Sequence, residues 1–392
     1  MRTLEKVRKL PIRRSWTHWL VATVLVVIGL FAGDYISKKM IFERALYPIF
    51  GKLQSVSPRP IRPRRTVLVL IGDQEFYGER LAHRTPTKRD YLADLIRKLS
   101  DAGPELIALD FTMRSASGQD SKENPEYEQE TSKLKQAITE ASLKTKLVLA
   151  ITVAKEENSD SYSVEPTVLD DLYEKNLPLA KGFVHLPEDQ RRVPLTLKSS
   201  SNMTIDSFAA AAVRLVDGTA LAEAEANRVG ALPFGTFIEP AKFKTLSASE
   251  VLTTDPVKLK SDIACKIVLI GGVWHATPQG RPFESDLFLT PVGKLDGVFV
   301  HANFIEALLD SRTYRPLGPW VAISLEALLS SIVAVILGLT WPLWRRLRLL
   351  VLVCAFLVLL SYVLWQNLGV FFDCFVPILL LVIHVLVERL LG

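Results

Sequence analysis

Cysteine is scarce in this sequence, with three residues in a chain of 392. Cys354 and Cys374 fall inside long apolar runs, which leaves Cys265 as the only cysteine in the large region between those runs. A disulfide within that region is therefore excluded, and its stability must come from its own hydrophobic core, which a region of this length can form. Cys265 begins a strand-like run, and we expect it to be a small core residue.

Motifs of catalysis and metal binding are also missing. The sequence contains no Walker A motif and no G-x-S-x-G nucleophile motif, and no Ser-His-Asp set is visible. His275 and His301 lack the paired spacing of zinc ligands. We therefore predict that the protein is not an enzyme, that it has no catalytic residues, and that it holds neither a cofactor nor a metal.

Positive charge is limited as well. The formal net charge is +5, and much of it lies in residues 1–14 and in PRPIRPRR at 58–65. Nucleic-acid binding requires a basic face on a soluble domain. No such face is indicated, so we expect no nucleic-acid partner.

Long apolar runs, in contrast, are prominent. A helix that crosses a bilayer needs about 20 apolar residues. The competing interpretation of residues 1–33 is a signal peptide, which is disfavoured because the apolar run is too long and no A-x-A cleavage site follows. We predict four transmembrane helices, one N-terminal and three C-terminal, at 16–33, 319–341, 347–365 and 368–387.

Basic residues predict how these helices are oriented, since short cytoplasmic flanks are rich in Lys and Arg. Residues 1–15 are strongly basic, and the short loop between the second and third runs, counted with the start of the third, holds Arg345, Arg346 and Arg348. Both flanks place the two termini in the cytoplasm of a multi-pass inner-membrane protein that contacts membrane lipid. A connector at 34–65 then leads to a periplasmic or extracellular domain at 66–318.

The outer domain shows alternating strand and helix patterns. A β-α-β-α-β order of this kind predicts an α/β fold with a mainly parallel sheet and helices on both faces. The middle of the domain, 154–245, is harder to assign and shows only a helical pattern at 205–216 and strand-like pieces at 182–186 and 228–238. The clearer strands are predicted at 66–72, 105–111, 146–153 and 266–272, and the clearer helices at 87–102, 130–143, 247–253 and 298–310.

Two blocks of this domain resemble a known family. The sequence is similar to the second family of CHASE domains, which are cyclase/histidine-kinase-associated sensory extracellular domains. The resemblance implies a sensory role, although family members usually continue into a cytoplasmic kinase, cyclase or phosphatase, whereas this sequence ends at Gly392. We expect a stand-alone membrane form. The matching segments are VLVLIGDQEFYGE (67–79), GPELIALDFTM (103–113), KIVLIGG (266–272), DLFLTPVG (286–293) and DGVFVHANFIEALL (296–309).

Polar residues after the strands are candidates for a ligand site, because ligands bind beyond the carboxyl ends of parallel strands. Gly271 and Gly272 do not form a dinucleotide fingerprint, since the following VWHATPQGRPFESD contains two prolines that prevent an immediate helix. A structural alternative stays open, in which such residues only cap loops and helix starts, as Thr87–Asp90 does in a capping-box pattern. The candidate ligand-binding residues are Asp73, Arg89, Asp110, His275, Asp286, His301 and Asn303.

The apolar runs contain four residues typical of helix packing. Gly29 and Gly33 form a G-x-x-x-G motif, which lets two helices approach closely. Glu326 and Asp373 are carboxylates within runs and are expected to face other helices.

Three functions compete on these observations. The first is a sensory or scaffold protein that passes ligand or partner state to a separate signalling or assembly protein. The second is a structural subunit of an envelope-spanning assembly, and the third is an envelope enzyme, which no motif supports. A homo-oligomer is compatible with the first two.

Overall fold

The computed structural model divides the chain into two compact units, Gln54–Thr313 and Met1–Leu53 with Tyr314–Gly392. Each unit is described by itself. The structure describes residues 49–50, 53, 62–84, 86–114, 125–156, 159, 161–173, 177–186, 192–200, 203–219, 221, 231–233, 237–275, 286–290, 292–310, 315–316, 324, 328, 343–368 and 370–371.

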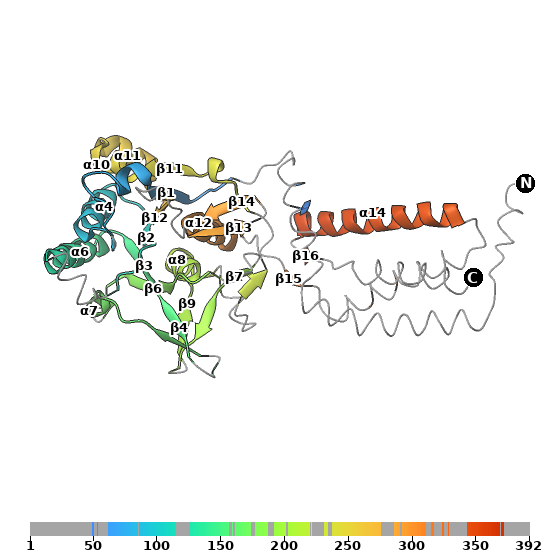
Figure 1. The fold of residues 1–392 in the computed structure, drawn as a ribbon, viewed down its shortest axis with the longest axis horizontal. Helices are drawn as coiled ribbons and strands as arrows, with labels where there is room; N and C mark the ends of the chain where they lie inside the picture. The colour runs from blue at the N-terminus through green and yellow to red at the C-terminus, as the bar shows by residue number, and fades with distance from the viewer. Residues whose placement is uncertain are drawn as a thin grey trace, which may run out of the picture. The chain divides into compact units, whose positions relative to one another are not determined.

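The first unit is built on a six-stranded sheet with the order β11-β1-β12-β2-β3-β6 (Figure 1). Every pair of neighbouring strands in it is parallel. The prediction of a mainly parallel sheet is thereby confirmed. The strands are β1 (Thr66–Ile71), β2 (Leu106–Leu109), β3 (Lys146–Ile151), β6 (Leu179–Phe183), β11 (Lys244–Ser247) and β12 (Ile267–Gly272).

Burial on both faces explains why the central strands were clear in the sequence. A strand covered by helices on both sides is an uninterrupted apolar run rather than an alternating one. All four residues of β2 are buried, and β1 and β12 are nearly as well covered. The β1-α4-β2-α6-β3 order along the chain is the one predicted.

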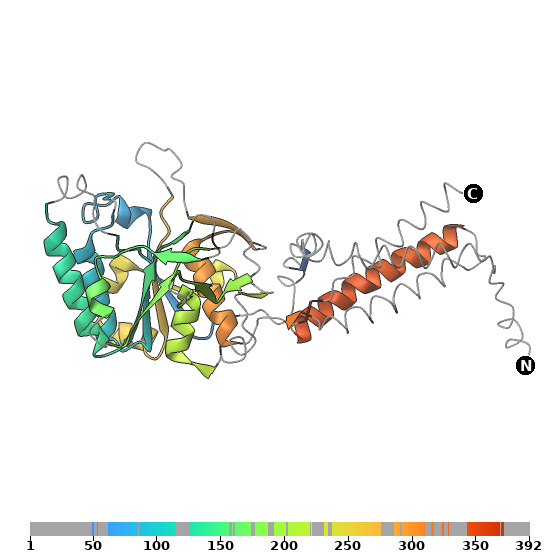
Figure 2. The same ribbon diagram turned by 90° about the horizontal axis from the view of Figure 1, so that it is seen from below.

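Helices lie on both faces of the sheet (Figure 2). One face packs against α4 (Arg89–Asp101), α6 (Tyr127–Ser142), α10 (Ala248–Thr253) and α11 (Pro256–Ile263). The other carries α8 (Phe208–Val216) and α12 (Gly297–Leu309), which contact β3 and β12. The helix α11 was not predicted, although Asp255 caps it by accepting N–H bonds from Val257 and Lys258.

Short antiparallel strand pairs and single turns complete the unit. The middle region, 154–245, holds most of these pairs. Of the strand-like pieces predicted there, 182–186 overlaps only the end of β6, and 228–238 contains the three-residue strand β10 (Ala231–Pro233). The remaining elements of the unit are α3 (Asp73–Phe76), β4 (Val153–Lys155), β5 (Tyr162–Val164), α7 (Asp170–Tyr173), β7 (Arg192–Pro194), β8 (Thr196–Lys198), β9 (Thr204–Asp206), β10 (Ala231–Pro233), η2 (Pro240–Lys242), β13 (Leu287–Thr290) and β14 (Gly293–Asp296).

Two local predictions are wrong. Cys265 is exposed rather than in the core, and its positive φ of 57° places it in the tight turn that leads into β12. The capping box at Thr87–Asp90 is not formed: α4 begins after Lys88, no side chain caps it, and Asp90 accepts the N–H of its neighbour Tyr91 at 2.8 Å.

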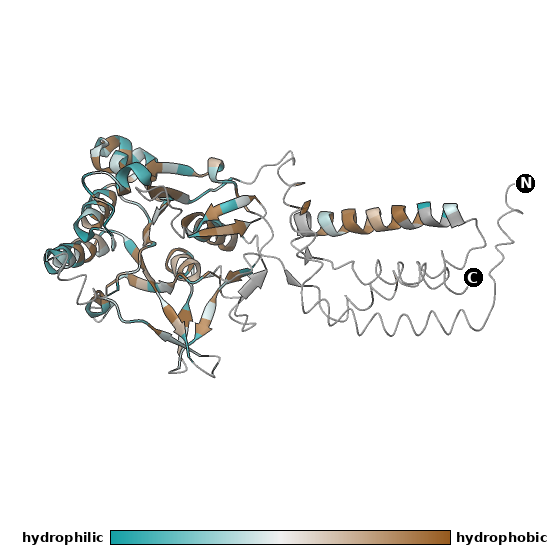
Figure 3. Ribbon diagram, in the orientation of Figure 1, coloured by the Kyte–Doolittle hydropathy of each residue, from teal (hydrophilic) through white to brown (hydrophobic). Residues whose placement is uncertain are grey.

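The described part of the second unit consists mainly of α14 (Leu343–Leu368), whose apolar residues are visible in Figure 3. The pair β15 (Arg315–Pro316) and β16 (Val370–Phe371) is parallel, and Phe50 lies edge-on to Tyr362 at 5.4 Å between ring centroids. Within the residues that the structure describes, no helix combines the length and hydropathy required to cross a membrane. Some predicted residues lie outside the described ones, namely Gly29, Gly33, Glu326 and Asp373.

Candidate functional site

The carboxyl ends of three neighbouring strands bring predicted site residues together. Strand β12 lies between β1 and β2, so the residues that follow these strands meet at one edge. Asp73 begins α3 just after β1, and its Oδ1 accepts the backbone N–H of His275, which follows β12, at 2.9 Å. Asp110 directly follows β2 and donates its own N–H to Ile270 on β12 at 2.9 Å. We call this region the carboxyl edge.

The hairpin β13–β14 adds two more acids to the carboxyl edge. Asp296 ends β14, and its Oδ1 lies 3.2 Å from His275 Nε2. Asp286 precedes β13 and its carbonyl accepts the N–H of Gly297, the first residue of α12, at 2.9 Å. A Cβ on Gly297 would lie 2.0 Å from Asp286 Oδ2, so only glycine permits this approach. Asp296 was not among the predicted residues.

Burial changes the charge of these acids. Removal from water, followed by repulsion from Asp286, raises the pKa of Asp110 to about 8. Burial, with repulsion from Asp296 as the second cause, also raises the pKa of Asp286. Asp296 has its pKa raised mainly by burial, and the neighbouring His275 opposes that rise. Asp110 is consequently a neutral carboxylic acid at pH 7.

His301, on α12, lies beside Asp110, and its Nε2 is 4.0 Å from Asp110 Oδ1. Its ring packs edge-on against Phe208 at 5.2 Å between centroids. Burial lowers the pKa of His301 to about 4. The pair is therefore an uncharged imidazole beside a carboxylic acid rather than an ion pair, and such a pair can exchange hydrogen bonds with a polar ligand without a charge to neutralise.

An aromatic stack explains the glycines at the end of β12. Trp274 stacks on Phe76 at 4.3 Å between ring centroids and lies 6.2 Å from Phe111. A Cβ on Gly272 would approach the Trp274 ring to 2.1 Å, and one on Gly271 would approach Val298 to 2.5 Å. These glycines make room for a tryptophan and for α12, which agrees with the absence of a dinucleotide fingerprint.

Two predicted residues do not join the carboxyl edge. Asn303 is fully buried and ties α12 to Ile238, accepting its N–H at 2.6 Å and donating to its carbonyl at 3.3 Å. Arg89 lies at the start of α4, where its Nη2 donates to the carbonyl of Arg114 at 2.8 Å. Asn303 is explained by this structural role.

Arg89 belongs to a buried charge cluster formed with Arg84, Tyr127, Glu130 and Thr131. The Glu130 carboxylate pairs with Arg84 and accepts the N–H of Arg89 at 3.2 Å. The centre of the Tyr127 ring lies 5.0 Å from the guanidinium carbon of Arg84 and 4.9 Å from that of Arg89. One carboxylate thus pairs with the Arg84 guanidinium and also accepts the backbone N–H of Arg89, so Glu130 is the central residue of the cluster.

Glu306 is a further residue that was not predicted from the sequence. It lies near the end of α12 and is fully buried. Its two carboxylate oxygens accept the backbone N–H groups of Arg64, Arg65 and Thr66 at 3.0, 2.9 and 2.6 Å. A carboxylate in a mostly apolar helix was the available signal, since a buried charge requires partners. We call this contact the Glu306 clasp.

The described residues contain no group of three or more His, Cys, Asp or Glu arranged to hold a metal ion. The carboxyl edge is thus a set of neighbouring acids and histidines without a metal-ligand geometry among the described residues.

This fold and site define an α/β domain of the kind that presents polar groups at the carboxyl edge of a parallel sheet. The sequence matches the family model of the CHASE2 domain over residues 21–340, which is most of the chain. The protein therefore belongs to the CHASE2 family, a family of sensory extracellular domains. Comparisons with curated proteins and with solved structures gave no match.

Asp110 is expected to lower the stability of the outer domain as the pH rises from about 3.8 to about 8, and the range from 6.5 to 8 isolates this effect because His301 opposes it at lower pH. In this range Asp110 keeps its proton in the folded state, with a pKa of about 8, whereas its carboxyl in the unfolded chain, with a usual pKa of 3.8, is ionised. The folded state then holds the extra proton, so a rising pH disfavours it. His301 acts in the opposite direction between about pH 6.5 and 4, where only its unfolded form takes up a proton.

Urea unfolding at several pH values measures this dependence. Asp110→Asn removes this titrating group and should remove its share of the loss between pH 6.5 and 8, which we expect to be about 1–2 kcal/mol. Asp286 and Asp296, whose pKa values are also raised, account for any loss that remains. An unchanged slope in Asp110→Asn would show that another group titrates.

Proposed function

We propose that this chain is a membrane-anchored extracytoplasmic sensor without catalytic activity, which passes the ligand or partner state of its outer domain to a separate cytoplasmic protein. A single observation carries the proposal: α12 joins the carboxyl edge to the Glu306 clasp. The helix begins beside Asp296 and carries His301, and its last turn holds Glu306, which binds the start of β1. The candidate site and the two ends of the domain are linked by one buried helix.

This geometry provides a route for transmission. A ligand shifts an equilibrium only if it binds one arrangement better than the other. Contacts at the carboxyl edge would favour one position of α12, and closely packed side chains transmit such a displacement rather than absorb it. The displacement would reach the clasp at Arg64–Thr66, and also Asp310, whose carboxylate lies 3.9 Å from the Arg64 guanidinium. The segment before Arg64 and the segment after Asp310 each lead along the chain toward a predicted membrane span.

The proposal includes four membrane spans with both termini in the cytoplasm. Its support is the set of apolar runs and the agreement of the two basic flanks. The third run lies within α14. Among the described residues, α14 exposes Arg345 and Arg348 near its start and a series of large apolar side chains: Trp344, Val351, Leu352, Phe356, Leu359 and Val363.

Cysteine labelling tests this topology. A single cysteine in place of Gln119 is expected to react with a membrane-impermeant maleimide in cells whose outer membrane is opened, because residues 66–318 face outward. A cysteine in place of Arg345 should react only after the inner membrane is permeabilised. Labelling of Arg345→Cys with Gln119→Cys protected would reverse the proposed orientation.

A further inference from the structure

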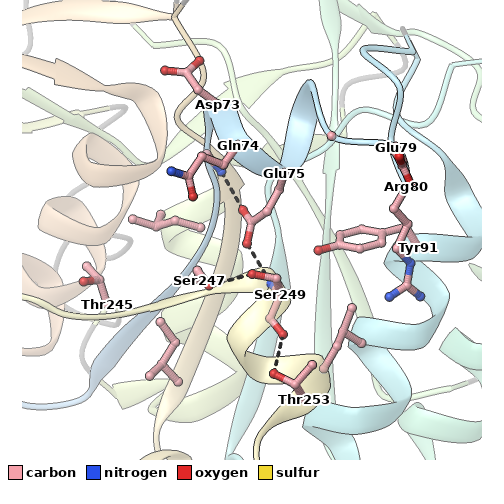
Figure 4. Close-up of a pocket in the computed structure, with 15 residues that line it drawn as sticks. Asp73, Gln74, Glu75, Glu79, Arg80, Tyr91, Thr245, Ser247, Ser249 and Thr253 are labelled. Atoms are coloured by element: carbon pink, nitrogen blue, oxygen red, sulfur yellow. Dashed lines mark hydrogen bonds between the residues drawn. The ribbon is translucent and has the colours of Figure 1, made fainter.

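A groove of about 690 Å³ lies on the far side of β1 from the Asp110 and His301 pair (Figure 4). The edge strand β11, the short helices α3 and α10, and the first turn of α4 form it. Its volume is in the range of small-molecule sites. Its polar lining includes Asp73, Glu75, Glu79, Arg80, Tyr91 and Ser249.

Tyr91 provides the observation that points to a ligand. Its side chain is only 3% exposed, and among the described residues its hydroxyl has no hydrogen-bond partner. Figure 4 shows the hydroxyl directed toward Glu75 and Ser249. A buried hydroxyl without a partner costs free energy, so its retention calls for an explanation. Burial, and then the charge of Glu75, raises the pKa of Tyr91 to about 12, so the phenol is a proton donor at neutral pH.

The neighbours of Tyr91 are already engaged with one another. Glu75 accepts the N–H groups of Gly72 and Ser249, each at 2.8 Å. The hydroxyls of Ser247 and Ser249 are 3.0 Å apart. A rigid frame of hydrogen bonds thus surrounds the phenol, and groups of this kind match the hydroxyls of a polyol, which both donate and accept.

The charge of the groove selects the ligand further. Three carboxylates line it, Asp73, Glu75 and Glu79, and among the described residues that line it Arg80 is the one cation. The Arg80 guanidinium is paired with Asp94 at 2.7 Å outside the groove lining and lies 4.8 Å from the centre of the Tyr91 ring. The groove therefore presents net negative charge to a ligand, which favours a cation and disfavours an anion.

We propose that this groove binds a small polyhydroxylated molecule that carries a protonated amine, as an amino sugar does. Tyr91 donates a hydrogen bond to a ligand oxygen, and the rim carboxylates attract the ammonium. The inference names a ligand class for the proposed sensory role and rests on that role for its biological meaning. Its test measures binding alone, so it can fail without affecting the proposed topology, and the topology can fail without affecting it.

Calorimetric titration of the full chain in nanodiscs tests the proposal with three probes that differ in charge: glucosamine, glucose and glucuronate. We expect glucosamine to bind in the millimolar range usual for ligands of this size, glucose to bind more weakly, and glucuronate not to bind. Equal affinities for the three probes, or no binding of glucosamine at about 10 mM, would overturn the proposal.

Two variants assign the contacts. Tyr91→Phe should weaken glucosamine binding by about 2- to 10-fold, while the melting temperature stays equal or rises because an unpaired buried hydroxyl is removed. Glu79→Gln should reduce the preference for glucosamine over glucose. Tyr173→Phe, outside the groove, is the matched control and should leave binding unchanged. If Tyr91→Phe lowers the melting temperature and leaves binding intact, the hydroxyl has a structural role instead.

Discussion

Replacement of Glu306 by alanine is expected to destabilise the outer domain by about 3–5 kcal/mol, since an unsatisfied buried N–H costs about 1–3 kcal/mol and the carboxylate serves one buried and two partly buried N–H groups. The side chain is fully buried, so water cannot replace it without opening the packing of α12. Glu306→Gln should cost less, because one oxygen remains as a hydrogen-bond acceptor. It should still destabilise the domain, because the amide N–H₂ cannot accept a backbone N–H.

Urea unfolding of the full chain, followed by tryptophan fluorescence, measures these losses. Asp310→Asn is the matched control: Asp310 lies one turn further along, and its 3.9 Å pair with Arg64 involves a guanidinium that is 80% exposed. Such exposed pairs contribute about 0–1 kcal/mol. An equal effect of Glu306→Ala and Asp310→Asn would exclude the clasp as a major stabilising contact.

Replacement of Glu130 by alanine, as a separate variant, is expected to lower the free energy of unfolding by about 3–5 kcal/mol, because removing one partner leaves uncompensated buried charge. Arg89 is 2% exposed and the Arg84 side chain 12%. Both guanidinium groups would therefore remain in the interior, Arg84 without its paired carboxylate and Arg89 without the nearest negative charge and without the acceptor of its backbone N–H. The cluster joins the start of α4 to α6, and its loss should loosen that face of the domain.

Two comparisons separate charge from packing in this cluster. Glu128→Ala removes an exposed carboxylate from the same helix and should change the unfolding free energy by less than about 0.5 kcal/mol. The double variant Arg84→Met/Glu130→Met replaces a buried pair with apolar side chains and should recover part of the stability lost in Glu130→Ala. A double variant less stable than Glu130→Ala would contradict the charge argument.

Most of the central sheet could be predicted because buried strands leave a strong signature. Strands β1, β2, β3 and β12 are short Val, Ile and Leu runs, and α4 has a regular apolar face. The hairpin β13–β14 left no such signature, since each strand has four residues and Leu287 and Leu289 are exposed. Strand β11 has only one buried residue and was missed for the same reason.

The candidate site was harder to predict because it depends on contacts distant in sequence. That β12 inserts between β1 and β2 is not encoded in the order of the elements, yet it decides that Asp73, Asp110 and His275 share one edge. The partners of Glu306 are backbone N–H groups, so no sequence motif indicates where this carboxylate binds. The Tyr91 groove likewise arises from β11 and α10, which lie far along the chain from α4.

The central claim is that a change in the outer domain reaches the cytoplasmic side. The most direct test uses a chain with Cys265, Cys354 and Cys374 replaced and a single cysteine in place of Arg345, labelled in inverted membrane vesicles. We predict that Glu306→Gln, which weakens the clasp, changes the labelling rate at position 345, and that a flexible Gly-Ser insertion after Gly318 removes that change. If the rate stays the same while protease digestion shows that Glu306→Gln has loosened the outer domain, transmission is contradicted, and the outer domain is a packing module of a structural assembly.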